Sequence, residues 1–322
     1  MQIGGARSRL PEWARKSPTN FASLHRLKAG LRSARLHTVC ESARCPNIHE
    51  CFGRGAATFL ILGDRCTRGC GFCAVAKGDP AKIDMRLDPG EPANVAGMAA
   101  AMALRYVVIT SVNRDDLEDG GSRHFAETVR RVRQALPEAR VEALTPDFEG
   151  DREAVARVLD AGPHVFNHNV ETVPRLYRRV RPQADYRRSL EVVAFARGYL
   201  SGGPWADEGA TVRASLGLTR QEPYPTAFVK SGFMVGLGET EDEVHALLRD
   251  LRAAGAGVVT IGQYLQPARR NLPVAAYIEP RRLAAYGEYG RSLGFRAVFS
   301  GPLVRSSYMA EAVSEEALRR PC

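Results

Sequence analysis

Short runs of consecutive apolar residues recur from residue 58 onward, and they alternate with segments that have a helical pattern of apolar positions. Continuous runs of this length are typical of parallel strands that are covered on both faces. The predicted strands are residues 58–63, 106–111, 140–145, 164–171, 228–237 and 258–265. The predicted helices between them are residues 91–104, 122–136, 151–161, 186–199, 240–254 and 280–293.

Six β-α units in series predict a parallel sheet that is wound in one sense. Such a sheet is either doubly wound or partly closed into a barrel. No G-x-G-x-x-G motif opens the first unit, so a dinucleotide-binding Rossmann fold is not supported. We therefore expect an α/β protein with a partial (β/α)6, TIM-like barrel, whose chemistry gathers at the C-terminal ends of the strands. A cysteine-rich loop begins at that end of the first strand.

Three parts are expected along the chain. Residues 1–57 are rich in loops and form an N-terminal cap, residues 58–296 form the barrel, and residues 297–322 form a C-terminal segment. Residues 202–225 separate the fourth helix from the fifth strand by more than most connections, so we interpret them as an insertion.

The composition is that of a soluble globular protein, with 44% hydrophobic and 25% charged residues in a chain of 322. No apolar run approaches the ~20 residues of a membrane helix, and no secretory signal is visible, so we expect a cytoplasmic protein without a membrane partner. The net charge of +9 fits either a nucleic-acid partner or an acidic protein partner. The arginines are scattered without interleaved aromatic residues, which favours solvated helix faces over a nucleic-acid site.

Six of the seven cysteines lie between residues 37 and 75, in two groups of three. The second group, Cys66, Cys70 and Cys73, has the spacing C-x3-C-x2-C, with Phe72 before the last cysteine. A zinc site usually takes four ligands, and the paired C-x2-C spacing of zinc ribbons is absent. An iron–sulfur cube held by three thiolates leaves one iron open for a substrate or cofactor. The spacing therefore favours an open iron–sulfur cluster.

The sequence CTRGCGFC at residues 66–73 resembles the signature of the radical S-adenosylmethionine (SAM) superfamily. The resemblance implies a 4Fe-4S cluster whose open iron chelates the amine and carboxylate of SAM. It also implies that one electron from this cluster cleaves SAM to methionine and a 5′-deoxyadenosyl radical. A cofactor must supply such a radical, because no protein side chain homolyses an unactivated C–H bond.

The first group of cysteines extends the resemblance. Cys40, Cys45 and Cys51 have the spacing C-x4-C-x5-C, and the sequence around them resembles the lipoyl synthase family. The resemblance covers about residues 11–310 apart from residues 202–225. Its further motifs are TSVNRDDLEDGG (110–121), LTPDFEG (144–150), DAGPHVFNHNVETVPRLYRRVRP (160–182), KSGFMVGLGET (230–240), TIGQYLQP (260–267) and SGPLVRSSY (300–308).

This resemblance implies a second, auxiliary 4Fe-4S cluster on Cys40, Cys45 and Cys51. Its fourth ligand in the family is a serine of the motif R-S-S-Y, here residues 305–308. By its position before the tyrosine, that serine should be Ser307. A hydroxyl binds iron–sulfur clusters less well than a thiolate, which suits a cluster that is consumed as a sulfur source.

The implied reaction inserts sulfur at C6 and C8 of an octanoyl chain that is attached to a lysine of a lipoyl carrier domain, with one SAM for each C–H bond. The implied carriers are the E2 subunits of 2-oxoacid dehydrogenases and the glycine-cleavage H protein. A reductant such as ferredoxin or flavodoxin and an iron–sulfur carrier that rebuilds the auxiliary cluster complete the expected partners.

Polar residues near the strand ends are candidate contacts for SAM or substrate. Lys230 lies in an apolar strand, where an idle buried amine is costly, although its amine can also reach solvent from the strand end. For Asn169 and Glu171, helix capping is the alternative role. At Asn113 the family more often has aspartate, so a role that needs charge does not carry over. The candidate set is Phe72, Ser111, Asn113, Asn169, Glu171, Arg181, Lys230 and Gln263.

Three other interpretations stay open. Another two-cluster sulfur-inserting radical enzyme, such as a biotin-synthase-like protein, is disfavoured by the C-x4-C-x5-C group together with R-S-S-Y. A non-catalytic zinc or electron-transfer module is disfavoured by the barrel pattern and the open group of three cysteines. A nucleic-acid-modifying radical enzyme rests on charge alone.

Overall fold

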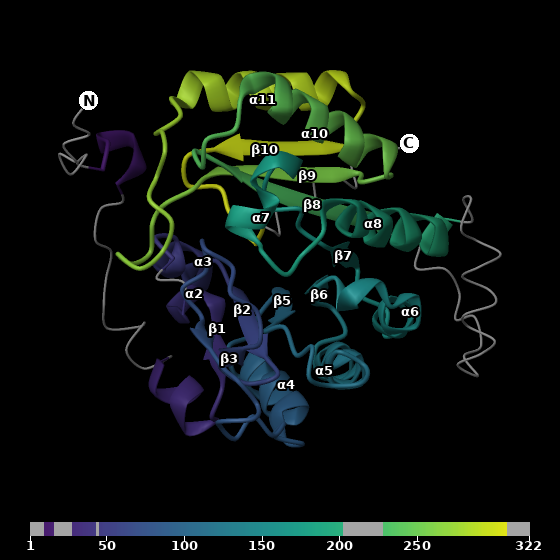
Figure 1. The fold of residues 1–322 in the computed structure, drawn as a ribbon. Helices are drawn as coiled ribbons and strands as arrows, with labels where there is room; N and C mark the ends of the chain where they lie inside the picture. The colour runs from purple at the N-terminus through teal and green to yellow at the C-terminus, as the bar shows by residue number, and fades with distance from the viewer. Residues whose placement is uncertain (1–9, 16–27, 43–44, 202–227, 308–322) are drawn as a thin grey trace.

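The computed structural model of the chain describes residues 10–15, 28–42, 45–201 and 228–307 (Figure 1). The insertion predicted at residues 202–225 and the tyrosine of the R-S-S-Y motif lie outside these ranges. Among the described residues, no helix combines the length and the apolar character needed to cross a membrane.

A curved sheet with the strand order β1-β2-β5-β6-β7-β8-β9-β10 forms the centre of the protein. β1 runs antiparallel to β2, and every other neighbouring pair is parallel. Both faces are covered, as parallel sheets require, so β2 and β9 are buried along their whole length. The strands are β1 (His37–Thr38), β2 (Ala56–Ile61), β5 (Tyr106–Ser111), β6 (Arg140–Leu144), β7 (Val165–Asn167), β8 (Phe228–Val235), β9 (Val258–Gln263) and β10 (Ala297–Gly301).

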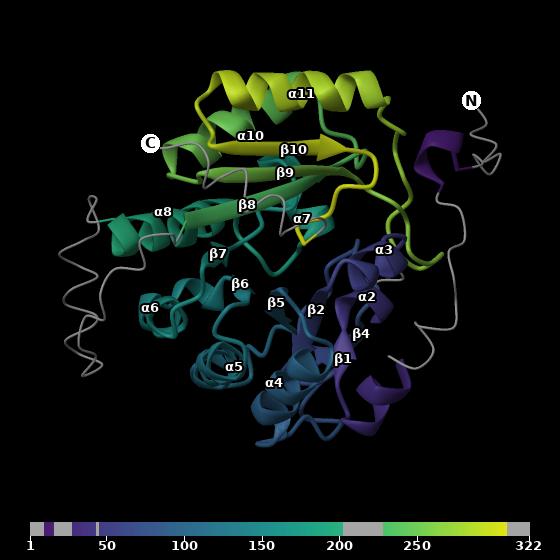
Figure 2. The ribbon, with the colours of Figure 1, turned by 180° about the vertical axis from the view of Figure 1, so that it is seen from behind.

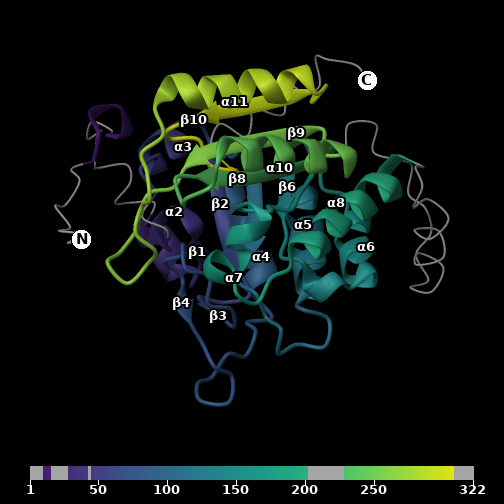
Figure 3. The same ribbon diagram turned by 45° about the horizontal axis from the view of Figure 1, so that its top comes forward.

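Helices cross the outer face of the sheet between successive parallel strands (Figure 3). They are α4 (Glu91–Ala101), α5 (Ser122–Ala135), α6 (Arg152–Asp160), α8 (Tyr186–Ser201), α10 (Glu241–Ala253) and α11 (Pro280–Ser292). Shorter elements lie in the connections and in the N-terminal cap: η1 (Glu12–Ala14), α2 (Val39–Ser42), α3 (Ile48–Gly53), β3 (Arg65–Cys66), β4 (Ala76–Lys77), η2 (Phe148–Gly150), η3 (Pro174–Leu176) and α7 (Tyr177–Val180).

This alternation confirms the predicted α/β fold with a partial, TIM-like barrel. The two-residue strands β1, β3 and β4 were not predicted, and several predicted strand ends differ by one or two residues. β7 and β10 differ more. β7 ends at Asn167 rather than at residue 171, because the regular pairing with β8 is interrupted after Asn167; Glu171, with a positive φ of 65°, then forms an isolated parallel bridge with Phe233. β10 was not predicted, since its five residues are short and partly polar, yet it pairs with β9 as a further parallel strand.

The interior of the barrel differs between its two ends. The first residues of β7, β8, β9 and β10 pack against one another in an apolar cluster of Val165, Phe228, Val258 and Ala297. Side chains therefore fill this half of the barrel at the amino ends of the strands. The carboxyl ends remain open to a cavity, where barrel enzymes place their chemistry.

The C-terminal segment turns back from the end of β10 toward the inner side of the sheet (Figure 2, yellow). It meets the N-terminal cap there, because the Asn47 side chain donates a hydrogen bond of 2.7 Å to the Leu303 carbonyl. α2 and α3 of the cap pack on β2. Both ends of the described chain thus reach the carboxyl end of the barrel.

Candidate active site

A cavity of about 950 Å³ lies at the carboxyl ends of the strands. Its wall includes residues of β2, β5, β6, β8 and β9, together with the N-terminal cap and the C-terminal segment. All of the second group of cysteines lines it, as do two of the first group and a serine near the end of the described chain, whereas Cys51 on α3 is not among the lining residues. The cysteines and the serine that line it are Cys40, Cys45, Cys66, Cys70, Cys73 and Ser307.

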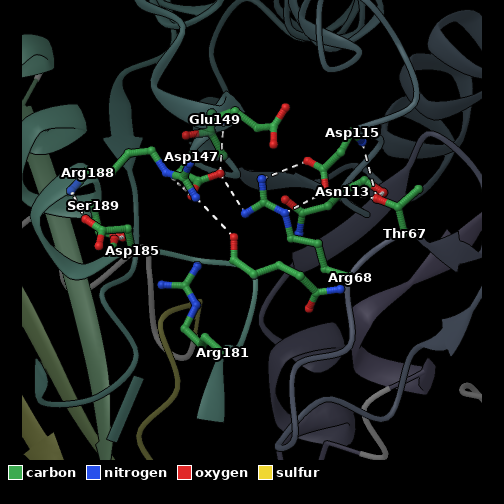
Figure 4. A network of polar contacts seen from close by, with 12 residues as sticks. Thr67, Arg68, Asn113, Asp115, Asp147, Glu149, Arg181, Asp185, Arg188 and Ser189 are labelled. Carbon is green, nitrogen blue, oxygen red and sulfur yellow. Dashed lines mark hydrogen bonds and ion pairs between the residues drawn. The ribbon is translucent and has the colours of Figure 1, made fainter. Parts of the chain in front are cut away.

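Arg68 anchors the loop that carries Cys66, Cys70 and Cys73. Its guanidinium makes two hydrogen bonds of 2.7 Å to the Asp115 carboxylate after β5 and an ion pair of 2.7 Å with Asp147 after β6 (Figure 4). Only 2% of the Arg68 side chain is exposed, so these are buried contacts of the strong, charge-assisted kind. They fix the cysteine loop to the ends of two neighbouring strands.

Asp147 is held in turn by a second arginine. Arg188 Nε donates a hydrogen bond of 3.0 Å to Asp147 Oδ2, on the other side of the carboxylate from Arg68 (Figure 4). Burial would raise the pKa of the Asp147 carboxyl, but the charges of Arg68 and Arg188 outweigh it and hold that pKa below its ordinary value. The anchor therefore stays ionised at neutral pH.

The other side of the same loop is tied through its backbone. The Gly71 N–H donates to the Val180 carbonyl at 2.9 Å, and the Gly71 carbonyl accepts from the Leu272 N–H at 2.9 Å. The Asn271 side chain donates to the carbonyls of Gly71 and Cys73. A Cβ at position 71 would overlap the Leu272 side chain, so this close approach requires glycine.

Backbone N–H groups point at the sulfur of Cys66. The N–H of Asn113 lies 3.3 Å from Cys66 Sγ, and the N–H of Arg68 lies 3.4 Å from it. The Asn113 side-chain amide lies 3.9 Å from the same sulfur. Hydrogen bonds to ligand sulfurs shift the reduction potential of iron–sulfur clusters, so Asn113 is placed to act through Cys66 without carrying charge.

The first group of cysteines is gathered by the short helices of the cap. Cys40 lies on α2, Cys51 lies on α3, and the Cys45 N–H between them donates to the Cys40 carbonyl at 3.0 Å. Burial raises the pKa of the Cys40 thiol to about 12, and the neighbouring Cys45 and Cys51 push it in the same direction. Cysteine binds metals as the thiolate, so loading of a metal group on these cysteines would release protons.

The cysteines surround the cavity without converging on one point. In the described part of the chain, no three His, Cys, Asp or Glu side chains lie close enough to hold a single metal ion.

Comparison with known proteins identifies the family. Residues 60–202 match the model of the radical SAM superfamily, and residues 2–45 match that of the N-terminal domain of lipoyl synthase. Lipoyl synthase of Rubrobacter xylanophilus is 48% identical over 96% of this chain and 88% of its own length. Lipoyl synthases of Methylococcus capsulatus and Thermus thermophilus are 50% and 48% identical over 95% and 96% of this chain and 87% and 88% of their own lengths. The chain belongs to the lipoyl synthase family.

Membership of the lipoyl synthase family, within the radical SAM superfamily, implies SAM and 4Fe-4S clusters as cofactors. A solved structure of methylornithine synthase is a more distant likeness, with 15% identity over 81% of this chain and 64% of that chain and a TM-score of 0.47.

The polar lining of the cavity fits a ligand with many donors and acceptors, as SAM has. Several buried polar atoms there have no partner among the described residues: Ser111 Oγ, Thr145 Oγ1, His168 Nε2, Asn169 Oδ1 and Thr260 Oγ1. Leaving such an atom without a partner costs about 1–3 kcal/mol. A polar molecule in the cavity would supply these partners.

Asn169, Glu171 and Arg181 form a connected group on one wall. Asn169 Nδ2 donates to Glu171 Oε1 at 3.0 Å, and Arg181 Nη1 donates to the Asn169 carbonyl at 3.0 Å. Burial raises the pKa of the Glu171 carboxyl, although the Arg181 charge and the Asn169 hydrogen bond act against the shift. All three residues line the cavity, as their prediction as SAM or substrate contacts requires.

The cavity wall also includes Phe72, Ser111, Asn113 and Gln263, whereas Lys230 is not among its lining residues. The Gln263 amide donates to the carbonyls of Tyr264 and Ala276 and accepts from the Ile278 N–H, so its polar atoms hold the loop after β9. The sequence predicts Lys230 as a SAM or substrate contact, but its side chain is fully buried in an ion pair with Glu142. This placement argues against direct contact between Lys230 and SAM.

Several residues of the site were not predicted from sequence. His168 is one of them: its Nδ1 lies 3.0 Å from the Thr145 carbonyl, which leaves Nε2 as an acceptor at the cavity wall. Burial lowers the pKa of His168 to about 4, so the ring is neutral at physiological pH. Two charged residues were also not predicted: Arg68, which lies between Cys66 and Cys70 in the sequence, and Glu142, which lies in an apolar strand. A charged residue in such a position signals a buried partner.

Proposed function

We propose that this chain is a lipoyl synthase that inserts two sulfur atoms, at C6 and C8 of an octanoyl group on a lysine of a lipoyl carrier domain. The observation that carries the proposal is that five of the six cysteines, drawn from both groups, line one cavity together with Ser307 from a distant part of the chain. Two incomplete sets of ligands in one cavity suit a reaction that needs a radical source and a sulfur source side by side.

The cluster that binds SAM would be held by Cys66, Cys70 and Cys73. The auxiliary cluster would be held by Cys40, Cys45, Cys51 and Ser307. We propose the same three parts as the sequence predicts, residues 1–57, 58–296 and 297–322, except that β10 extends the barrel sheet to Gly301. When bound, the clusters and SAM supply the 5′-deoxyadenosyl radical and the inserted sulfur.

The residues of the chain would prepare this chemistry by binding and orientation. Arg68 and the backbone ties of Gly71 hold the loop of the first cluster still. Ser111, Asn169 and Glu171 would bind the polar groups of SAM, and Arg181 orients Asn169 through its carbonyl. The backbone N–H groups that face Cys66 Sγ would tune the potential at which the cluster gives up its electron.

Apolar side chains on the same cavity wall would receive the octanoyl chain. The apolar side chains that line the cavity include Leu60, Leu144, Phe233 and Met234. Each CH₂ group of the octanoyl chain that is buried against them would contribute about 0.8 kcal/mol to binding. These side chains would also keep water from the carbon that loses hydrogen.

The partners follow from the same reaction. The carriers would be the E2 subunits of 2-oxoacid dehydrogenases and the glycine-cleavage H protein. A ferredoxin or flavodoxin would deliver electrons, and an iron–sulfur carrier would rebuild the auxiliary cluster. A cytoplasmic location is part of the proposal.

The test is anaerobic incubation of the cluster-loaded protein with an octanoylated carrier peptide, SAM and reductant. Mass spectrometry should show a product with two added sulfurs, and the protein should be brown and contain iron and sulfide. A colourless protein that binds only zinc, or a peptide that gains no sulfur while SAM is cleaved, would overturn the proposal.

A further inference from the structure

A buried polar cluster lies directly beneath the cavity, inside the barrel. Side chains alternate along a strand, so Glu142 faces the same side of the sheet as Leu144, and Lys230 faces the same side as Gly232. Leu144 and Gly232 both line the cavity. Glu142 and Lys230 therefore lie two residues further along their strands from the cavity, between the cavity and the apolar amino end of the barrel.

Glu142 and Lys230 form the centre of this polar cluster. Lys230 Nζ lies 3.0 Å and 3.1 Å from the two carboxylate oxygens of Glu142. The same oxygens accept hydrogen bonds of 2.7 Å from the Asn167 amide and the Tyr106 hydroxyl. The side chains of Glu142 and Lys230 are fully buried. Four strands, β5 to β8, each contribute one residue to the cluster.

The third N–H donor of Lys230 points away from the polar cluster and toward the C-terminal segment. Lys230 Nζ donates to the main-chain carbonyl of Ser306, the residue before Ser307. An ammonium group has three N–H donors, and these contacts occupy all of them. Lys230 therefore has no donor left for a ligand in the cavity.

Two other contacts fix the position of the C-terminal segment around Ser306. Asn169 Nδ2 lies 3.2 Å from Ser306 Oγ, and a Cβ at Gly262 would overlap the Val304 carbonyl. The segment thus lies directly on β9, at a position that only glycine permits. From the opposite side, Asn47 holds the Leu303 carbonyl, as described above.

We propose that Lys230, oriented by Glu142, is a positioning residue that fixes the Ser306 carbonyl and thereby places the Ser307 hydroxyl for the auxiliary cluster. The inference rests on the proposed function for the role of Ser307. It assigns the buried ion pair to the auxiliary site rather than to SAM. Loss of Lys230 should therefore weaken one cluster and spare the other.

The test separates the two clusters by the iron that each retains. One background carries Cys66→Ala, Cys70→Ala and Cys73→Ala, so that only the auxiliary cluster can load. The other carries Cys40→Ala, Cys45→Ala and Cys51→Ala, so that only the SAM cluster can load. Each receives the pair Lys230→Met and Glu142→Gln, which removes both buried charges and leaves an amide that can still bond Tyr106 and Asn167.

Iron and sulfide per chain should fall in the first background and stay unchanged in the second. When the same pair of substitutions is made in a chain that keeps all its cysteines, the ratio of 5′-deoxyadenosine to lipoyl product should rise by about tenfold. This is the change in an equilibrium constant expected from the loss of one hydrogen bond to a charged group. Mössbauer spectra should show the change at the auxiliary cluster only.

Tyr106→Phe is the matched control. It removes the 2.7 Å hydrogen bond from Tyr106 to Glu142 but leaves the contact between Lys230 and Ser306 in place. Neither the iron content of the two backgrounds nor the product ratio should change in this variant, while circular dichroism reports that all variants fold.

Unchanged auxiliary iron and an unchanged product ratio in the double variant would overturn the inference. An equal loss of iron in both backgrounds, or the same loss in Tyr106→Phe, would overturn it as well, because it would show a general effect on the fold. Failure of the native chain to insert sulfur would instead overturn the proposed function, and the two outcomes are distinguishable because the iron measurement needs no substrate.

Discussion

The two groups of cysteines differ in how the chain brings their ligands together. Cys66, Cys70 and Cys73 lie on one loop that is tied on two sides, by the buried Arg68 and by the backbone of Gly71. The proposed auxiliary group combines cap residues with Ser307, which reaches the cavity only because the barrel folds. A ligand set on one loop needs a rigid loop, whereas a set from distant segments needs the whole fold to be correct.

The comparison predicts that the two sites fail separately. Cys70→Ala should abolish SAM cleavage and with it lipoyl formation, since no other described cysteine of the loop can replace the lost ligand. The measurement is 5′-deoxyadenosine by chromatography after anaerobic reduction. Retained 5′-deoxyadenosine production would refute the assignment of Cys70 as a ligand.

A smaller effect is expected when the loop loses its anchor. Arg68→Met should lower SAM cleavage by about 10–100-fold, the usual cost of losing a residue that orients a metal ligand. It also leaves Asp147 buried beside a single arginine. Arg188→Met is the control, because Arg188 touches Asp147 but not the cysteine loop. Equal effects of the two changes would show that Arg68 acts only through the stability of the fold.

Ser307→Ala sharpens the comparison from the auxiliary side. Lipoyl formation should fall by about tenfold or more, while SAM cleavage should be much less affected, since this change removes one weak ligand of the auxiliary group only. Both products are measured in the same reaction. Equal loss of the two activities would contradict the division of labour between the sites.

The smallest effect is expected outside both sites, at the amino end of β7. Burial, together with the charges of Arg133 and Arg140, lowers the pKa of His164 to about 4, and its Nδ1 accepts a hydrogen bond from the Val141 N–H. The unfolded chain, with an ordinary pKa near ~6.5, binds the proton more tightly. Stability should therefore fall as the pH drops from about 6.5 to about 4.

His164→Gln keeps an acceptor for the Val141 N–H but does not titrate. Its thermal midpoint should decline less than that of the native chain over this pH range, in anaerobic denaturation followed by circular dichroism. The ratio of 5′-deoxyadenosine to lipoyl product should not change. An identical pH dependence in both proteins would show that His164 does not contribute to acid sensitivity.

The parts of the protein that depend on short segments were predictable from sequence. Buried parallel strands are short continuous apolar runs, so β2, β5 and β9 were found close to their observed bounds. The cysteine loop was predictable because its ligand spacing is local. Short elements such as β10, which owe their pairing to a neighbour, carry too little pattern to be recognised.

Pairings between distant residues were not predictable. Lys230 and Glu142 are 88 positions apart, and Arg68 and Asp115 are 47 apart. Each residue alone indicates that a buried charge needs a partner, but the strand order decides which partner it meets. The sequence predicts that Lys230 contacts SAM or substrate, whereas in the structure its amine binds Glu142 and the Ser306 carbonyl of the C-terminal segment.

The most direct test of the account measures both reaction products in Cys45→Ala. Cys45 lines the cavity on the auxiliary side and has no contact with the loop of Cys66, Cys70 and Cys73 among the interactions of the described residues. With octanoylated carrier peptide, SAM and reductant, the variant should form 5′-deoxyadenosine but no peptide with added sulfur. Sulfur insertion at the native level, or a loss of 5′-deoxyadenosine in parallel with the loss of sulfur insertion, would contradict two sites with separate tasks.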